Sequence, residues 1–438
     1  MHVMIIGAGI GGLSLAQGLK QAGVDVTVHE RDRTRTERLQ GYRIHVAPYG
    51  CRALNACLPA DVYDLFVSTS GQANSTLAFY TEKLDELITL DTTEIGMDTD
   101  HRTDTFRSVS RITFREVLLA GLGDIVHFGR AFTHYTHERD GRVTAHFSDG
   151  TRATGDVLVG ADGTNSAVRT QYLPQAAHAD TGAVAVSGKV PLGGDAARLL
   201  PRPFSTGGAM VLAPGGYFGF LAVHEFRRDE RGGALSLSPD FGIDPQLLLD
   251  NTTDYVMWNV LAKREKFGDR KALAAMSAEE IRTLVLRSVG TWHPHLLRLI
   301  EESDTGTVSV HALHTSRRPK PWAPGNVTVL GDAIHAMPPT AGAGANAAVV
   351  DAELLCRRLV AVAEGQELAA AVGAYEKDML DHAFTKVAAA NRNLEQGVAD
   401  NRLALAGFKA FLRLAGRVGP IRRKMTAAMA GQQSPRSA

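Results

Sequence analysis

The first residues of the chain constrain its fold more than any other segment, because a short apolar run leads directly into a cluster of glycines. Residues 3–6 read Val-Met-Ile-Ile and predict a buried parallel strand. Residues 7–12 read Gly-Ala-Gly-Ile-Gly-Gly and match the pattern G-x-G-x-x-G. Residues 13–22 have the apolar spacing of a helix, and residues 24–29 that of a second strand. This order of elements predicts a dinucleotide-binding βαβ unit.

The glycines of this turn have separate roles in holding a pyrophosphate. Gly7 makes the tight turn, Gly9 lets the backbone approach the phosphates, and Gly12 lets the helix pack closely against the strand. The free N–H groups and the positive dipole end of the following helix attract the same phosphates. An acid that binds the ribose is expected about 20 residues further on, and Glu30 stands close to that position. The predicted contacts of this unit are Gly7, Gly9, Gly11, Gly12, Glu30 and Arg31.

Two further motifs share the form of a buried strand that ends in a tight turn. Residues 156–163 form one of them, and residues 327–339 form the other, with Gly-Asp at the end of the strand and two prolines further on. A glycine-rich segment at 342–346 then opens a long helix that extends to about Val362. Because ligands of open parallel sheets bind beyond the carboxyl ends of the strands, the turn that holds Asp332 is predicted to face the dinucleotide.

With these three motifs in this order, the chain resembles the single-component FAD-dependent aromatic monooxygenases, the group typified by p-hydroxybenzoate hydroxylase. Within that group it looks most similar to the tetracycline-inactivating and natural-product-tailoring hydroxylases. The resemblance extends to about residue 400 and implies that the dinucleotide is FAD. The chain departs from many relatives at Ala343, where they carry Gln or Lys between the two glycines of the third motif, and this bears on the contacts with the flavin.

The resemblance assigns FAD contacts to residues of the later motifs and to two arginines. Asp332 is expected to hydrogen-bond the ribityl chain, and the start of the long helix is expected to face the pyrimidine edge of the flavin, where negative charge develops on reduction. Arg43 and Arg111 are expected to reach the flavin or its phosphates, since the guanidinium fork suits phosphate. For Asp162, a purely structural role in its turn is an alternative. The full set is Arg43, Arg111, Asp162, Asp332, Pro338, Gly344, Ala345 and Asn346.

Residues 175–290 contain alternating and aromatic-rich runs that predict an antiparallel sheet. In the family that the chain resembles, such a sheet roofs the substrate cavity above the flavin. Because side chains alternate along a strand, only half of each strand can face the cavity, so core packing is an equally good interpretation of every candidate. The candidates are Met210, Tyr217, Phe218, Phe220, His224, Met257, Trp258 and Asn259. Their methionine and aromatic content predicts an apolar, planar ligand.

The expected fold class is therefore α/β, with a Rossmann-like FAD-binding domain whose parallel sheet is interleaved with an antiparallel-sheet substrate domain, followed by C-terminal helices. The expected division is residues 1–174 and 291–362 for the FAD-binding domain, 175–290 for the substrate domain and 363–438 for the helical segment. Helix breaks are expected near Gly365 and Gly373, and residues 401–424 are expected to form one helix.

The resemblance implies a monooxygenase in which NAD(P)H reduces FAD, O2 adds to form a C4a-hydroperoxyflavin, and one oxygen atom passes to an apolar or aromatic small molecule. The sequence holds no second G-x-G-x-x-G, so a separate Rossmann domain for NAD(P)H is not expected. No residue stands out as a catalytic base, and no metal-ligand cluster is evident. Two other functions stay open: an FAD-dependent reductase of an isoprenoid-type substrate that does not use O2, and a non-enzymatic flavoprotein that sequesters a ligand.

Composition argues against some partners and leaves others open. Lys+Arg and Asp+Glu are equal at 47 each, so no overall field recruits nucleic acid. The cysteines form no CxxC pair, and no apolar run has membrane length, which together favour a cytoplasmic protein. Near the end of the chain, Lys409, Arg413 and Arg417 form a basic stripe on one helix. The stripe is expected either to face water while an apolar side docks on the body, or to contact a membrane surface or a second copy. A monomer and a homodimer are both compatible with the sequence.

Overall fold

A five-stranded parallel sheet forms the centre of the nucleotide-binding lobe. The computed structural model describes residues 1–35, 37, 43–71, 75–98, 101–193, 200–201, 207–226 and 254–432. The strand order is β17-β11-β1-β2-β7, and each neighbouring pair is parallel. The strands are β1 (His2–Ile6), β2 (Asp25–His29), β7 (Val126–His127), β11 (Val157–Gly160) and β17 (Val327–Val329). With α1 (Ile10–Gln21) between β1 and β2, the predicted βαβ unit is confirmed.

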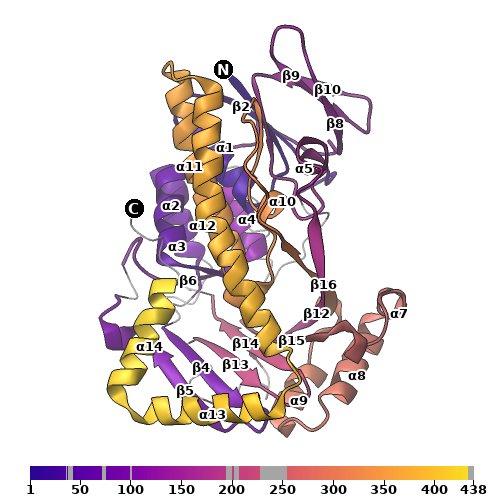
Figure 1. The fold of residues 1–438 in the computed structure, drawn as a ribbon, viewed down its shortest axis with the longest axis vertical. Coiled ribbons are helices and arrows are strands. Elements are labelled where there is room, and N and C mark those ends of the chain that lie inside the picture. The colour runs from indigo at the N-terminus through magenta and orange to yellow at the C-terminus, as the bar shows by residue number, and fades with distance from the viewer. Residues whose placement is uncertain are drawn as a thin grey trace.

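Helices and a smaller sheet surround this parallel sheet (Figure 1). The helices that pack with α1 or with one another are α2 (Pro48–Cys57), α3 (Ala60–Thr69), α4 (Arg111–Leu119), α11 (Gly344–Ala363) and α12 (Leu368–Gly397). The smaller antiparallel sheet consists of β8 (Phe132–His137), β9 (Val143–Phe147) and β10 (Arg152–Gly155), with the short helix α5 (Ala167–Tyr172) beside it. Because elements cover β1 closely, residues 3–6 are all buried, as an apolar parallel strand requires.

The second lobe is built on a seven-stranded sheet of order β16-β12-β15-β14-β13-β4-β5. Its strands are β16 (Ser309–Ser316), β12 (His178–Pro191), β15 (Tyr255–Lys263), β14 (Phe218–His224), β13 (Gly207–Leu212), β4 (Thr76–Thr81) and β5 (Glu86–Asp91). Every pair is antiparallel except β13 with β4, which is parallel. The predicted antiparallel sheet therefore includes one parallel pair, and it takes β4, β5 and β16 from outside residues 175–290. The α/β fold class with interleaved sheets is confirmed.

One face of the seven-stranded sheet is covered by helices and forms a core of its own. These helices are α7 (Arg270–Ala275), α8 (Ala278–Ser288) and α9 (Pro294–Glu301). The buried residues of this core include Val211, Leu221, Trp258 and Trp292. The opposite face is turned toward the nucleotide-binding lobe, because His224 on that face contacts Ser108 of the two-stranded ribbon β3 (Arg43–Val46) and β6 (Arg107–Ser110). The two lobes therefore meet where this ribbon contacts the seven-stranded sheet.

Three helices complete the chain and differ from expectation in two ways. The helix α12 runs through Gly373 without the expected break, and a Cβ on Gly373 would lie 3.0 Å from Cγ of Pro324, so this glycine allows close packing instead. The single helix expected at 401–424 is wrong: α13 (Arg402–Arg417) ends before Val418, and α14 (Gly419–Gln432) follows it. Within the described ranges, no helix has the length and apolar character needed to cross a membrane.

The first of the two arrangements expected for α13 is found only in part. Leu405 and Leu412 pack on the body, and Arg413 and Arg417 are exposed. However, Nζ of Lys409 lies 2.8 Å from Oε2 of Glu82, at the body of the protein, whereas Phe411 and Leu414 are 50% and 61% exposed. The helix docks through Leu412. Apolar residues occur around most of its circumference, so the sequence pattern alone does not identify the side that packs.

Candidate functional site

The glycine turn between β1 and α1 has the shape that a pyrophosphate requires. Gly7 has a φ of +109°, and a Cβ built on it would lie 2.5 Å from the carbonyl oxygen of Ala161. A Cβ on Gly12 would collide with the carbonyl oxygen of Gly7. No atom lies within 4 Å of a Cβ built on Gly9, so a ligand can approach the backbone from the side that a side chain would cover. Close packing explains Gly7, Gly11 and Gly12, and ligand approach explains Gly9.

Glu30 closes the same turn from the end of β2. Its side chain is buried, its Oε2 accepts the backbone N–H of Ala8 at 2.7 Å, and its Oε1 accepts that of Asp32 at 3.0 Å. Arg31, the neighbouring predicted contact, is exposed. Arg115 is absent from the predicted contacts, yet its Nε donates to the carbonyl oxygen of Ala8 at 3.1 Å. Its position one turn along the helix that begins with the predicted phosphate-binding arginine was the available signal.

Two predicted FAD contacts, which come from distant parts of the chain, interact electrostatically beside this turn. Arg111 is the first residue of α4, and Asp332 is the first residue of α10 (Asp332–His335). Both side chains are exposed at the surface, yet the surrounding protein shifts the pKa of both groups. Burial lowers the pKa of Arg111, and the carboxylate of Asp332 opposes that shift. Burial raises the pKa of Asp332, and His335 and Arg111 counteract it. A cation and an anion on one accessible surface suit a cofactor that carries both phosphates and hydroxyls.

The start of α11 is tied to the ribbon by one amide. Nδ2 of Asn346 donates to the carbonyl oxygen of His45 at 2.7 Å, and its Oδ1 accepts the backbone N–H of Ala47 at 2.8 Å. The helix begins at Gly344, and the residue before it, Ala343, provides no side-chain cap. The first N–H groups of α11 therefore lack a capping side chain and are suited to a ligand with negative charge. Pro338, Gly344 and Ala345 lie in the same segment, and Pro338 is buried.

A buried charged network holds the turn that carries Asp332. Oδ2 of Asp351, on α11, accepts the backbone N–H of Gly331 at 2.8 Å and lies 2.5 Å from Nε2 of His335. Its Oδ1 lies 2.8 Å from Nε2 of His382, on α12. Burial acts to lower the pKa of His335, but Asp351 outweighs it and the pKa is raised. Burial acts to raise the pKa of Asp351, but the two histidines outweigh it and the pKa is lowered. Neither Asp351 nor His382 is among the predicted site residues.

The two carboxylate oxygens of Asp162 have different surroundings. Its Oδ2 accepts the backbone N–H of Ala167 at 2.8 Å and that of Val168 at 3.3 Å, which holds the turn before α5. Its Oδ1 is buried and has no hydrogen-bond partner among the described residues. Burial raises the pKa of this carboxyl. An unpartnered buried acceptor beside the glycine turn fits a cofactor with ribose or ribityl hydroxyls, so the residues present fit FAD.

Because side chains alternate along the strands, the predicted substrate contacts lie on two opposite faces of the sheet. Met210, Phe218, Phe220 and Met257 lie on the face turned toward the nucleotide-binding lobe, together with His224 and Asn259. Trp258 lies on the opposite face, where it is 1% exposed and its Nε1 donates to Oγ of Ser303 at 2.6 Å. Its assignment to the substrate is therefore corrected to core packing, because neighbouring residues of a strand point to opposite faces. Tyr217 precedes β14 and packs against Phe267 with ring centroids 6.1 Å apart.

The face ends in a polar cluster that joins the two lobes. Nε of Arg43 donates to Oγ of Ser108 at 2.6 Å, and Oγ of Ser108 lies 2.9 Å from Nδ1 of His224. The ring centroids of His224 and Tyr255 are 5.2 Å apart, and Nζ of Lys189 lies 4.6 Å from the centroid of Tyr255. Arg43 thus faces the seven-stranded sheet as well as the ribbon. Ser108, Tyr255 and Lys189 are absent from the predicted site, since only the register of the folded strands brings them together.

Two atoms of this cluster are buried without a partner among the described residues: Nε2 of His224 and Oη of Tyr255. Burial, reinforced by Arg43 and Lys189, lowers the pKa of His224 to about 3. Burial lowers the pKa of Arg43 to about 10 and raises that of Tyr255 above its ordinary value. At neutral pH the cluster therefore offers a neutral imidazole, a neutral phenol and the cationic Arg43. Such unpartnered groups can hydrogen-bond a polar atom of a ligand.

Comparison with known proteins identifies the family of the chain. The model of the family described as "FAD binding domain" matches residues 1–192 and 270–390. The chain belongs to this family. One relative, the dual O-methyltransferase/FAD-dependent monooxygenase CTB3 of Cercospora beticola, is 34% identical over 378 residues, which are 82% of this chain and 42% of that protein. The chain therefore spans less than half the length of this relative.

A further relative and a solved structure each cover most of the chain. The FAD-dependent urate hydroxylase of Klebsiella pneumoniae is 30% identical over 389 residues, which are 87% of this chain and 86% of that protein. The crystal structure of Klebsiella pneumoniae HpxO with FAD and uric acid has a TM-score of 0.75 at 23% identity, over 99% of this chain and 96% of that one, and shows that the fold is shared. The resemblance to FAD-dependent monooxygenases is confirmed, and FAD is the cofactor of the family.

Proposed function

We propose that the protein is an FAD-dependent monooxygenase that uses NAD(P)H and O2 to hydroxylate an apolar, aromatic or polycyclic small molecule. The observation that carries this proposal is the sheet face on which Met210, Phe220 and Met257 lead to the unpartnered atoms of His224 and Tyr255. When bound, FAD supplies the redox chemistry with NAD(P)H and O2 as co-substrates. The names of the relatives, which include a urate hydroxylase, support an oxidation of this kind.

The FAD would lie along the residues that the fold collects at the carboxyl ends of the parallel strands. The turn at Gly7–Gly12 and Arg111 would hold the pyrophosphate. Asp332 and Asp162 would accept hydrogen bonds from hydroxyl groups of the cofactor. The uncapped start of α11 would face the flavin. Asn346 links that helix start to the carbonyl oxygen of His45, which lies on the same strand as Arg43. The polar cluster would therefore lie close to the flavin, where a substrate must lie in order to be oxidised.

The chemistry of the sheet face selects the substrate class. Thioether and aromatic side chains favour a flat, apolar molecule. The polar cluster then orients it through one oxygen: Nε2 of His224, held by the contact of Nδ1 with Ser108, and Oη of Tyr255 are positioned to hydrogen-bond that oxygen. Arg43 adds positive charge and favours an oxygen that carries negative charge, such as a phenolate or an enolate. Buried apolar walls also exclude water from the site.

The direct test is to follow NADH and NADPH oxidation by FAD-loaded protein while oxygen uptake and peroxide are recorded. The panel comprises phenols, hydroxyquinones and polycyclic aromatics, each with a matched analogue that lacks the hydroxyl. We expect a hydroxylated member to stimulate NAD(P)H oxidation with oxygen consumption and little peroxide, and its deoxygenated analogue to stimulate it less. Stimulation without oxygen uptake would instead identify a reductase. Tight ligand binding without any NAD(P)H oxidation would identify a sequestering flavoprotein.

A further inference from the structure

The two C-terminal helices expose an unusual concentration of large apolar side chains. Leu403 is 87% exposed, Phe411 50% and Leu414 61% on α13, and Phe408 and Ile421 on α13 and α14 are also exposed. Among the described residues, Met1 is the only other large hydrophobic residue in the exposed class. Exposed apolar residues are normal when they are scattered singly, whereas a contiguous group on one element marks a contact surface.

These side chains are not needed to attach α13 to the protein. The helix docks through Leu412 and Ala415, each 1% exposed, against Leu87, Ile88 and Leu90 of β5. Leu403 and Leu414 are about three helical turns apart on one side of α13, roughly 160–180° around the axis from the docked Leu412. Phe411 lies about 60° from Leu414 and about 100° from Leu412. The exposed apolar side and the docked side are therefore two different faces of the same helix.

The charges on this part of the chain have a single sign. Every charged residue from position 401 onward is basic: Arg402, Lys409, Arg413, Arg417, Arg422, Arg423, Lys424 and Arg436. Because the formal net charge of the whole chain is zero, residues 1–400 carry a net negative charge. The protein therefore separates its charges, and its positive end coincides with its exposed apolar side chains.

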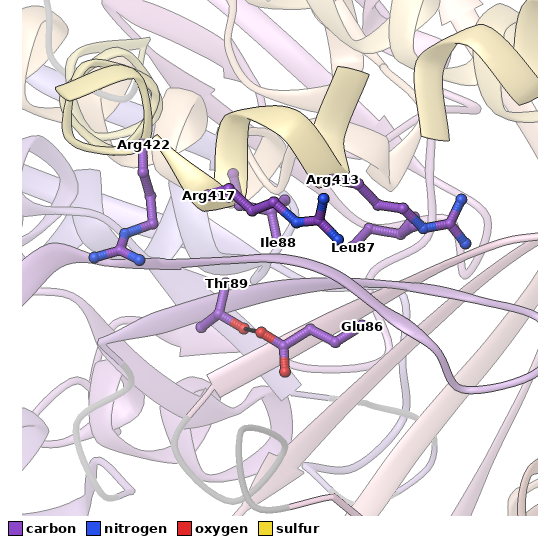
Figure 2. A pocket seen from close by; sticks show the side chains of 8 residues that line it. Glu86, Leu87, Ile88, Thr89, Arg413, Arg417 and Arg422 are labelled. Atoms are coloured by element: carbon purple, nitrogen blue, oxygen red, sulfur yellow. Dashed lines mark hydrogen bonds between the residues drawn. The ribbon is translucent and has the colours of Figure 1, made fainter. Parts of the chain in front are cut away.

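Three of these arginines gather over the edge strand β5 (Figure 2). Arg413, Arg417 and Arg422 border a surface depression of about 330 Å³, together with residues 86–89, which include the carboxylate of Glu86. Arg422 forms an ion pair with Glu94 at 2.9 Å. In the part of the chain that the structure describes, Arg413 and Arg417 have no ion-pair partner. Their guanidinium groups are suited to bidentate contact with phosphate.

We propose that α13 and α14 bind the surface of an anionic phospholipid bilayer. Leu403, Phe411 and Leu414 insert among the acyl chains near the headgroups, and Arg413 and Arg417 contact lipid phosphates. An amphipathic helix with an apolar side flanked by basic residues has this mode of binding, and each basic residue near an anionic surface strengthens it. A second copy of the chain fits this surface less well, because a symmetric contact between two such helices would bring arginines of like charge together.

Vesicle co-sedimentation of the FAD-loaded full chain tests the proposal without reference to its enzymatic activity. The protein is mixed with vesicles of phosphatidylcholine alone or of equimolar phosphatidylcholine and phosphatidylglycerol. The variants are Arg413→Gln with Arg417→Gln, and Leu403→Ser with Phe411→Ser and Leu414→Ser. The control is Arg139→Gln with Arg152→Gln, which removes two exposed charges from the turn and strand near β9, at the other end of the molecule (Figure 1). Bound FAD and unfolding midpoint are measured for each to confirm the fold.

We expect the wild type and the control to sediment with the anionic vesicles and to remain in solution with phosphatidylcholine alone. The double arginine variant should partition about 30-fold less, and added salt should release the wild type. The triple serine variant should also lose binding. Equal behaviour with both vesicle types, or wild-type partitioning of either variant, would overturn the proposal. So would a concentration-dependent dimer that forms without vesicles and that the serine substitutions abolish, because the apolar face would then be a contact between copies.

Discussion

Nε2 of His335 lies 2.5 Å from Oδ2 of Asp351, and neither side chain is accessible to solvent. The same oxygen accepts the N–H of Gly331, where φ is +63°, so one carboxylate fixes both the histidine and the turn that presents Asp332. A buried ion pair is costly to break because the remaining charge loses its counter-charge. This relationship makes the network a stability determinant of the cofactor-binding turn.

Replacement of Asp351 by Asn should lower the free energy of unfolding by about 3–5 kcal/mol and reduce the FAD content of the purified protein. The matched control is Asp378→Asn, which breaks the partly exposed pair with Arg358 at 3.0 Å and should cost less than about 1 kcal/mol. Urea unfolding of both variants gives the comparison. Equal, small losses in the two variants would show that the buried pair does not stabilise the turn.

The same pair predicts the pH range over which the turn is stabilised. The pKa of Asp351 is lowered, so its contribution is present above the ordinary carboxyl value of about 4 and is lost as the pH falls through the folded value. The pKa of His335 is raised, so its contribution is present below about 6.5 and is lost as the pH rises through the folded value. FAD release measured by fluorescence should therefore increase toward both acid and alkaline pH, and Asp351→Asn should flatten this profile.

Tyr255→Phe should weaken substrate binding without destabilising the fold, because the hydroxyl has no partner among the described residues. The loss of one hydrogen bond predicts a rise of about tenfold in the KM of a substrate identified by the oxidation assay. The control Tyr375→Phe removes a hydroxyl that donates to the carbonyl oxygen of Val329 at 2.9 Å, so it should cost about 1 kcal/mol of stability and leave the KM unchanged. The reverse pattern would place Tyr255 outside the substrate site.

Gly9→Ala should impair FAD binding rather than folding. A Cβ at this position meets no protein atom within 4 Å, so the free energy of unfolding of the apoprotein should change by less than about 1 kcal/mol. The methyl group would obstruct the pyrophosphate, and the Kd for FAD should rise more than about tenfold in a flavin fluorescence titration. Gly123→Ala makes the same change at another site without nearby atoms and should leave the Kd unaltered. An unchanged Kd for Gly9→Ala would exclude close approach at this glycine.

His224 makes a separate prediction about acid stability. Its pKa is lowered to about 3, so between about 3 and 6.5 the unfolded chain binds more protons than the folded one, and stability rises with pH across this range. His224→Gln should reduce the gain in stability between pH 4.5 and 7 by about 2 kcal/mol in urea unfolding. His137→Gln, on the exposed side of β8, is the control and should preserve the gain. A full gain in His224→Gln would show that this imidazole is hydrated in the folded protein.

Local patterns account for the parts of the predicted site that could be read from the sequence. The glycine turn, Asp332 and Asn346 each belong to a short sequence motif that is visible without the fold. Trp258 could not be separated from Met257 by composition, because both are large and apolar and only the strand register determines which face each occupies. The contact of Asp351 with His382 depends on how α11 and α12 pack, and no spacing within either helix reveals it.

The parallel pairing of β13 with β4 joins residues 207–212 to residues 76–81, and the chain passes through the nucleotide-binding lobe between them. The seven-stranded sheet is therefore assembled from stretches of chain that are interrupted by the other lobe. Neither lobe can be excised as a contiguous fragment, because any stretch of chain that spans the strands of one large sheet also contains strands of the other. In modular terms, the two lobes form a single unit of expression, so the sheet face that carries Met210 and Met257 can be altered by substitution but not by exchange of a whole contiguous domain.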